Sequence, residues 1–391
     1  MKQVAGPLAA TMLVQAMVAM AVSVLPVLSP VLADAYGIRS SLIGIYASLV
    51  FTGAIFCTAL GGTLVRRIGP IRCSQASLIV AGTALAMSAS GPLMAILVFG
   101  VVTGMGYGLA TPAASHILAR VTPAERRGIV FSAKQSAVPI GGLLAGLLAP
   151  VLATLFGWQT SIIILATIVT IFSLVIYPLR AQLDDDRDPT VAISLRSPLS
   201  TIIEAAREPA LRGLTLAAFT FAALQSSIFA IFTAYLVDRG GLDLITAGQA
   251  FATLQTAGVV ARLALGWVSD HWLLARRLLA IVGIGMTAVC LLAAQLSPSW
   301  PLLGVFAMSA LVGFVAAGWP GVYLAEIVRS VPAERVSVAT GGTVAFSFLG
   351  VVVGPALFST IVTLSGSYGL AFVAFGMVTA GVGIWLWRGA R

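Results

Sequence analysis

The sequence predicts an all-α membrane protein with twelve transmembrane helices in two six-helix bundles. Three observations lead to this prediction. Hydrophobic residues make up 59% of the 391 residues and charged residues only 9%, apolar segments of membrane-spanning length recur along the whole chain, and the second half repeats features of the first. A soluble fold of this size needs far more charge on its surface. We therefore expect the lipid bilayer to surround most of the chain.

A helix needs about 20 apolar residues to cross the hydrocarbon core of a bilayer. The twelve segments that meet this requirement are 8–33, 40–64, 73–90, 93–119, 127–152, 157–179, 213–236, 245–268, 276–296, 301–328, 335–363 and 367–387. The third is the weakest, because Ser88, Ser90 and Gly91 interrupt it. The apolar runs are continuous and lack the two-residue alternation of barrel strands, which favours helices.

The distribution of Lys and Arg predicts the orientation. With the N-terminus in the cytoplasm, 18 of the 22 Lys and Arg residues fall on the inner side, Arg39 and Arg239 fall outside, and Lys134 and Arg262 fall within the membrane. This asymmetry places both termini in the cytoplasm. The net charge of +9 is then mostly a positive-inside signal, and no nucleic-acid partner is expected. We expect a monomeric, multi-pass protein of the cell (inner) membrane.

The chain repeats itself at a fixed spacing. The tetrapeptide Pro-Ala-Glu-Arg occurs at 123–126 and at 332–335, an offset of 209 residues, and the segment around Gly62 resembles the segment around Gly266 at an offset of 204. We therefore expect an N-terminal six-helix bundle at residues 1–180, a cytoplasmic linker at 181–212 and a C-terminal six-helix bundle at 213–391. The acidic run Asp184–Asp186 in the linker is interpreted as part of a solvated tether.

Two cations lie at membrane depth, and no acid does. Lys134 lies about 7–10 residues into the fifth segment, roughly 10–15 Å at 1.5 Å per residue, near the middle of a hydrocarbon core about 30 Å thick. Arg262 lies eight residues before Asp270, about 12 Å from the inner end of the eighth segment. A charge at this depth is costly unless it faces protein or water. Both cations are therefore candidate substrate-binding residues.

Structural explanations compete with this interpretation. Lys134 is also compatible with a side chain that snorkels to the interface, or that loses its proton on burial. Arg262 keeps its proton and needs a partner, which helix carbonyls, Asp270, water or an anionic substrate can supply. The offsets pair Lys134 with Thr343 and Arg262 with Thr58, so each half contributes one cation with a neutral counterpart. An anion between two such cations removes their repulsion and draws the halves together.

Five further residues are candidate substrate contacts, and each is also compatible with packing alone: Gln255, Tyr107, Trp319, Gln15 and Gln225. Gln255 lies seven residues before Arg262 and on the same helix face.

The membrane segments contain no set of nucleophile and base, no metal cluster and no zinc-ligand spacing. The three cysteines, Cys57, Cys73 and Cys290, are scattered and suggest neither a metal site nor a disulfide framework. An enzyme, a cofactor and a metal site are therefore not expected.

The segment after the eighth helix, Gly266 to Asp270, resembles a loop motif of the major facilitator superfamily of secondary transporters, roughly G-x-L-a-D-R-x-G-R. The segment from Gly62 to Gly69 departs from it, because Arg66 stands where the acid is usual. The resemblance covers essentially the whole chain and implies two six-helix repeats around a midplane site. It also implies that Gly62, Arg66, Gly69, Gly266 and Asp270 take part in gating, with a different or weaker latch in the first half.

The run from Ala261 to Gly266 also resembles the monocarboxylate and oxalate/formate carriers of that superfamily, in which an arginine here is implicated in holding a carboxylate. A cation at Lys134 is not part of that resemblance, so the substrate identity does not transfer. Drug/proton antiporters of the superfamily carry an Arg early in the fourth helix, which this chain lacks. Their fifth-helix signature appears only as Pro139 to Gly142.

The sequence therefore predicts a secondary active transporter that moves a small organic anion, a mono- or dicarboxylate, by alternating access. Lys134 and Arg262 would hold the anion between the two halves. A co-transported proton and a counter-anion remain open as coupling partners. The alternative is an exporter of neutral or amphiphilic compounds in which both cations are structural. A receptor is disfavoured by the absence of an extra soluble domain, and a channel needs no two-half repeat.

Overall fold

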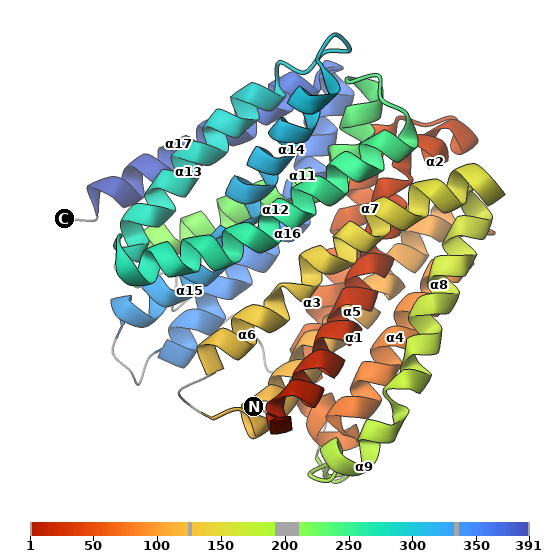
Figure 1. Cartoon of the computed structure of the whole chain (residues 1–391), viewed down its shortest axis with the longest axis vertical. Coiled ribbons are helices and arrows are strands. Elements are labelled where there is room, and N and C mark those ends of the chain that lie inside the picture. Colours follow the sequence, from red (N-terminus) through yellow and green to blue (C-terminus); the bar gives the residue numbers. More distant parts are fainter. Residues whose placement is uncertain (1, 124–126, 192–210, 332–335, 390–391) are drawn as a thin grey trace. The chain divides into compact units, whose positions relative to one another are not determined.

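The computed structural model describes residues 2–123, 127–191, 211–331 and 336–389. Within these ranges the chain is helical and contains no β-strand (Figure 1). It divides into two compact units, of which the first comprises Met1–Tyr36 and Leu49–Arg196 and the second comprises Gly37–Ser48 and Ser197–Arg391. Residues 124–126 and 332–335, which hold most of the repeated tetrapeptides, lie outside the described residues, as does 192–210 of the expected linker.

Eleven helical segments of the described residues are long and apolar enough to cross a membrane, and they correspond to eleven of the twelve expected segments. The third expected segment, 73–90, corresponds to α4 (Pro70–Met87), which has 18 residues and is not among the eleven. Helix α4 still packs along its neighbours α5 and α8. The twelfth span and the position of the termini stay predictions.

The first unit is a helical bundle packed around α1. Its elements are α1 (Lys2–Val27), α2 (Ser29–Tyr36), α3 (Ile43–Ile68) from Leu49 onward, α4, α5 (Leu93–Val121), α6 (Arg127–Gln135), α7 (Ala137–Phe156), α8 (Trp158–Val175), η3 (Tyr177–Leu179) and α9 (Arg180–Leu183). Helix α1 lies against α4, α5, α7 and α8. It is apolar over most of its surface, as expected of a central helix, and Val18, Val24 and Leu25 are fully buried.

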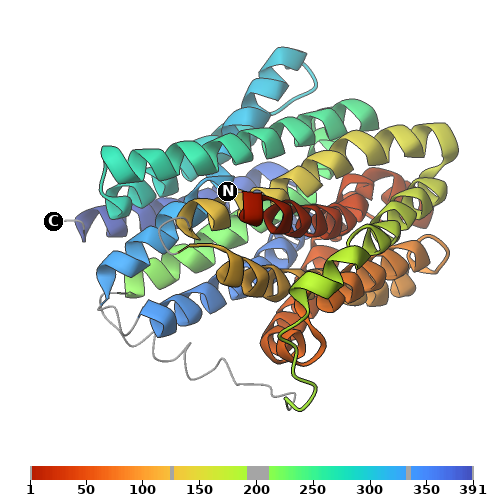
Figure 2. The same ribbon diagram turned by 60° about the horizontal axis from the view of Figure 1, so that its bottom comes forward.

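The second unit has a corresponding central helix, α11. Its elements are η1 (Ser40–Leu42), the start of α3, α11 (Arg212–Asp238), α12 (Leu244–His271), α13 (Ala275–Ala293), α14 (Leu302–Ala317), α15 (Trp319–Ser330), α16 (Val336–Ser365) and α17 (Tyr368–Arg388). Helix α11 packs mainly against α16 and α17, and Leu214, Phe221 and Leu236 along it are fully buried. Figures 1 and 2 show α13 and α17 running side by side in this unit.

Hydrogen bonds explain why the segment Gly37–Ser48 belongs to the second unit. The Ser40 hydroxyl donates to Asp238 Oδ2 at the end of α11, and the Tyr368 hydroxyl donates to the same oxygen over 2.7 Å. The Ser359 hydroxyl on α16 donates to the Ser41 carbonyl. Helix α3 therefore starts in the second unit and continues in the first.

The repeat read from the sequence recurs in the packing of the helices. A Cβ added to Gly104 on α5 would lie 1.7 Å from the Val50 carbonyl oxygen on α3. In the second unit, a Cβ on Gly313 of α14 would lie 1.9 Å from the Leu254 carbonyl oxygen on α12. The glycines are 209 residues apart and the carbonyls 204 apart, which are the two offsets found in the sequence. Small residues permit this close approach of helix backbones in a membrane.

Replacing Gly104 with alanine is expected to lower the stability of the fold. The added methyl group has no space at the Val50 carbonyl, and overpacking of this kind costs about 1–3 kcal/mol. Thermal unfolding of the purified protein in detergent measures the effect. The matched control is Gly6→Ala on α1, where the new Cβ meets no atom within 4 Å. A midpoint for Gly104→Ala equal to that of the control would show that the helices are not in this close contact.

Candidate functional site

The fifth expected segment is not one helix, and the break lies beside Lys134. Helix α6 ends at Gln135 and α7 begins at Ala137, so that Lys134 lies in the last turn of α6. The C-terminal end of a helix carries partial negative charge, which favours a cation there. Discontinuous membrane helices are typical of transporter binding sites. The span expected over 127–152 corresponds to the span Ala133–Phe156, and Ser136 lies within it between α6 and α7.

Lys134 points into the first unit and is only 2% exposed. Its Nζ donates to Gln15 Oε1 on α1 over 3.0 Å, and makes longer contacts with Gln135 Oε1 at 3.4 Å and Thr111 Oγ1 at 3.5 Å. The Thr111 hydroxyl on α5 also donates to Gln15 Oε1, over 3.2 Å. Three helices thus meet at this ammonium group, and the acceptors they offer it here are neutral.

The Lys134 site has unused capacity to bind a negative group. Among the described residues, no carboxylate lies within ion-pair distance of Lys134. Gln15 is 1% exposed, and its Nε2 is buried without a hydrogen-bond partner in the described part of the chain. A buried donor left unpaired costs about 1–3 kcal/mol. In the part of the chain that the structure describes, the site therefore presents the Lys134 ammonium group and one unpaired amide donor, and no carboxylate.

The second unit brings together two other predicted residues, Gln225 and Trp319. The Trp319 Nε1 donates to Gln225 Oε1 over 2.9 Å, from α15 to α11. The indole ring is 3% exposed and packs edge-on against Phe221 and Tyr323, with ring centroids 5.9 Å and 5.4 Å away. Trp319 lies directly after the break between α14 and α15 at Gly318.

The two candidates on α12 have different surroundings. Arg262 is half-buried, and its Nε donates to the Ala317 carbonyl oxygen over 3.2 Å. Gln255 is 2% exposed, and its Oε1 has no hydrogen-bond partner among the described residues. Tyr107, on α5 in the first unit, is half-buried and packs edge-on against Phe51 with centroids 6.1 Å apart.

The predicted gating residues of the first half lie at the junction of α3 and α4. Gly69 has a φ of 99°, which only glycine adopts without strain. A Cβ there would lie 2.5 Å from the Asp184 carboxyl carbon, while a Cβ on Gly62 would meet open space. The Arg66 carbonyl accepts a hydrogen bond from the Asp188 N–H over 2.7 Å. In the second half Gly266 also faces open space, and Asp270 lies 4.0 Å from Arg329.

The interpretation of the acidic run as part of a solvated tether is wrong for Asp184, while Asp185 and Asp186 are exposed. Asp184 is 6% exposed and accepts hydrogen bonds from the backbone N–H groups of Ile71, over 2.6 Å, and Arg72, over 3.3 Å. These N–H groups belong to the first turn of α4, where a helix has no internal acceptors. Burial raises the pKa of the Asp184 carboxyl group, and the bonds from Ile71 and Arg72 oppose that shift.

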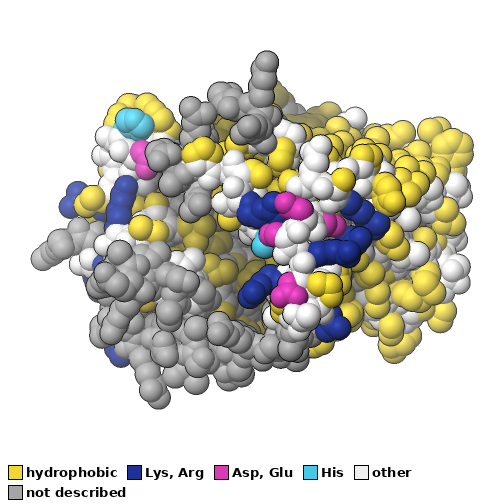
Figure 3. All heavy atoms as spheres, turned by 90° about the horizontal axis from the view of Figure 1, so that it is seen from below, with side chains coloured by type: hydrophobic (Ala, Val, Ile, Leu, Met, Phe, Trp, Pro, Cys, Tyr) yellow, Lys and Arg dark blue, Asp and Glu magenta, His cyan; other side chains and the backbone are white. Residues whose placement is uncertain are grey.

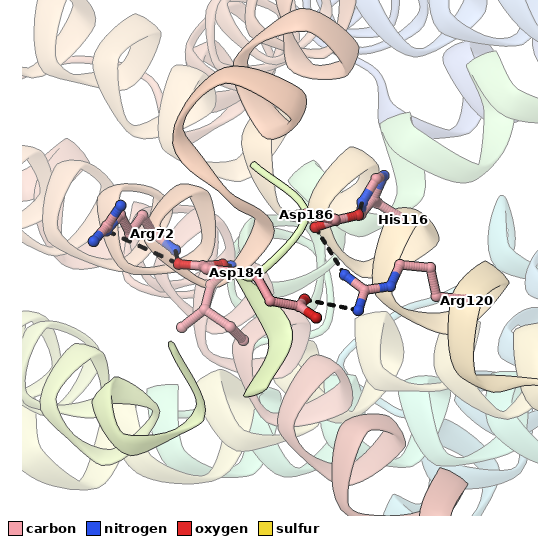
Figure 4. A network of polar contacts seen from close by, with 7 residues as sticks. Arg72, His116, Arg120, Asp184 and Asp186 are labelled. Carbon is pink, nitrogen blue, oxygen red and sulfur yellow. Dashed lines mark hydrogen bonds and ion pairs between the residues drawn. The ribbon is translucent and has the colours of Figure 1, made fainter. Parts of the chain in front are cut away.

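The next two acids of the run bind the end of α5. Asp186 contacts His116 Nε2 and Arg120 Nη1, each over 2.7 Å, and Asp185 contacts Arg120 Nη2 over 2.8 Å (Figure 4). The bond from Arg120 lowers the pKa of Asp185. Viewed from this end of the chain, acidic and basic side chains gather beside a broad hydrophobic surface (Figure 3). The acidic run Asp184–Asp186 therefore links the N-terminal end of α4 to the C-terminal end of α5.

Sequence reasoning did not identify Thr111, Gln135 or the role of Asp184. Thr111 lies four residues after Tyr107 on α5, but a single threonine in an apolar helix gives no signal of its own.

Among the described residues, no group of three or more His, Cys, Asp or Glu side chains is placed to hold a metal ion.

Comparisons with known proteins place this geometry in context. The sequence model of the family described as "Major Facilitator Superfamily" matches residues 11–341. The 4-hydroxybenzoate transporter of Acinetobacter baylyi is 28% identical over 134 residues, which are 34% of this chain and 29% of that protein. The hexuronate transporter of Bacillus subtilis is 22% identical over 373 residues, which are 90% of this chain and 87% of that protein. The chain thus spans under a third of the first relative and most of the second.

A solved structure shows the same fold. A bacterial homologue of the human lysosomal transporter Spinster, in an inward-facing and occupied conformation, superposes with a TM-score of 0.75 at 14% sequence identity. The match covers 99% of this chain and 97% of that one.

Proposed function

The chain belongs to the Major Facilitator Superfamily and is a multi-pass membrane transporter rather than an enzyme, and from this premise we propose that its substrate is a small organic anion carrying a carboxylate. The proposal places the protein in the cell inner membrane, with α4 as the twelfth span. Two of its relatives are transporters of 4-hydroxybenzoate and of hexuronate, both of which are organic carboxylates.

The observation that supports this proposal most is the burial of Lys134, which has no negative partner among the residues that the structure describes. The Lys134 side chain is 2% exposed, and its ammonium group contacts neutral acceptors. Such acceptors offset only part of the free-energy cost of removing the charge from water. A carboxylate supplies the missing charge, and charge-assisted hydrogen bonds are about twice as strong as neutral ones. The Gln15 Nε2, buried and unpaired in the described part of the chain, is suited to the second carboxylate oxygen.

The second unit contributes further groups in this proposal. Arg262, Gln255 and the hydrogen-bonded pair Trp319 and Gln225 are the residues of that unit proposed to contact or orient the substrate. Tyr107 has the same proposed role in the first unit. Binding of the anion by both units would couple occupancy to the change in access, because a ligand shifts a conformational equilibrium only through its different affinity for the two states.

Uptake into liposomes tests the proposal. Purified protein is reconstituted and offered labelled 4-hydroxybenzoate and glucuronate, each beside its uncharged amide, together with a lipophilic cation. We expect uptake of at least one acid above protein-free liposomes and none of its amide. A preloaded counter-anion in one series and a pH gradient in another would identify the coupling partner. Transport of amides or amphiphiles in preference to every acid would instead support the exporter of neutral compounds.

A further inference from the structure

Arg262 makes the same contact as its neutral counterpart in the first half. The Thr58 hydroxyl on α3 donates to the Gly108 carbonyl oxygen on α5 over 3.0 Å. Arg262 Nε on α12 donates to the Ala317 carbonyl oxygen on α14 over 3.2 Å. Thr58 and Arg262 are 204 residues apart, and Gly108 and Ala317 are 209 apart, so that both donor and acceptor are related by the repeat offsets.

Small residues line the helix crossings around both of these bonds. A Cβ on Gly108 would lie 2.2 Å from the Ala54 carbonyl oxygen, and a Cβ on Gly258 would lie 2.9 Å from the Ala317 Cβ. Ala54 and Gly258 are related by the offset of 204, so each crossing pairs one glycine with one alanine, on opposite helices. The Arg262 contact and the Thr58 contact thus lie at crossings whose small residues are related by the repeat offsets.

The second unit differs at the acceptor, because α14 ends there. Ala317 is the last residue of α14, Gly318 joins it to α15, and Pro320 follows in the first turn. The last carbonyls of a helix lack internal donors, and proline removes a further N–H. A Cβ on Gly318 would lie 2.6 Å from Leu265 Cδ1, so the break lies directly against α12. In the first unit, α5 runs uninterrupted from Leu93 to Val121.

We propose that Arg262 is a positioning residue whose Nε tethers the break between α14 and α15 and thereby orients Trp319. Trp319 is the first residue after the break and donates to Gln225 on α11. This role depends on a hydrogen bond to one carbonyl and is distinct from the positive charge that the proposed function uses. Only the transport measurements below rest on the proposed function.

The Thr58 contact suggests the experiment. Arg262→Thr introduces at position 262 the hydroxyl donor that Thr58 has in the first half. Arg262→Val introduces a side chain of the same shape as threonine but without a hydrogen-bond donor. Each variant is labelled with 5-fluorotryptophan, and the Trp319 signal is assigned among the seven tryptophans by Trp319→Phe. We expect the ¹⁹F signal of Trp319 to move in Arg262→Val and to stay at the wild-type position in Arg262→Thr.

A matched control separates positioning from general destabilisation. Thr58→Val removes the equivalent bond in the first unit and is expected to leave the Trp319 signal unchanged. A Trp319 signal that is unchanged in Arg262→Val, or that moves equally in Arg262→Thr and Arg262→Val, would overturn the proposal. This readout needs no substrate, so it stands if the anion proposal fails. If both proposals hold, Arg262→Thr also raises KM for the anion while Vmax falls less than in Arg262→Val.

Discussion

Replacing Lys134 with glutamine is expected to lower anion uptake at limiting substrate concentration by about 30-fold or more. Loss of one partner of a buried charged contact costs about 2–5 kcal/mol, and each 1.4 kcal/mol is a factor of ten. Glutamine keeps most of the length of the side chain and can still hydrogen-bond to Gln15 and Thr111. The measurement is the initial rate of uptake into liposomes with matched protein content.

The fold of Lys134→Gln is expected to be as stable as the wild type or more stable. The substitution removes a buried, unpaired charge whose desolvation opposes folding, so the thermal midpoint should not fall. Arg388→Gln is the control, because it removes one positive charge from an exposed side chain at the end of α17. Wild-type uptake rates in Lys134→Gln would remove this side chain from the transport mechanism.

Replacing Gln15 with glutamate is expected to reduce anion uptake about tenfold or more while stabilising the protein. The new carboxylate would take the place of the amide oxygen that lies 3.0 Å from Lys134 Nζ. It would compensate the buried charge permanently, and a substrate anion would have to displace it. A cost of 1.4 kcal/mol for that displacement already gives a factor of ten.

The stability of Gln15→Glu distinguishes this explanation from damage to the fold. We expect a thermal midpoint equal to or above that of the wild type, with uptake partly restored as the external and internal pH are lowered together and the new carboxyl group is protonated. The control is Gln295→Glu, which adds the same group at an exposed position after α13. Lower stability together with pH-independent loss of uptake would show that the new group is not paired with Lys134.

Hydropathy was sufficient to predict the membrane class and eleven spans, because the bilayer imposes the length of each apolar segment. It did not predict the breaks at Ser136 and Gly318. Gly318 lies inside a continuous apolar run, and Ser136 directly follows Lys134 and Gln135. Hydropathy does not register where backbone hydrogen bonds are interrupted. Pro320, just after Gly318, was the available signal.

The contacts of the candidate residues depend on packing that a single sequence does not display. A mid-membrane charge is rare and makes Lys134 recognisable in the sequence, but its partner Gln15 lies 119 residues away on another helix. The repeat offsets relate contacts between helices as well as positions in the sequence. Applied to Thr58 and Gly108, they relate the Arg262 contact to an ordinary hydrogen bond between two helices.

The burial of Asp184 shows that composition alone can wrongly predict an exposed residue. Three consecutive acids in a polar linker have the composition of a solvated segment, and composition alone favours that interpretation. The N-terminus of α4 needs acceptors, and Gly69 before Pro70 leaves space for a carboxylate there. The local sequence of one helix end thus determines the place of a residue more than 100 positions away.

The central claim is that Lys134 selects an anion, and equilibrium binding of matched compounds measures this most directly. Purified wild type and Lys134→Gln are titrated with each carboxylic acid that the wild type transports and with its uncharged amide. The account predicts that the wild type binds the acid at least about tenfold more tightly than the amide, a difference of 1.4 kcal/mol, and that Lys134→Gln binds the two alike. An undiminished preference for the acid in Lys134→Gln would contradict it.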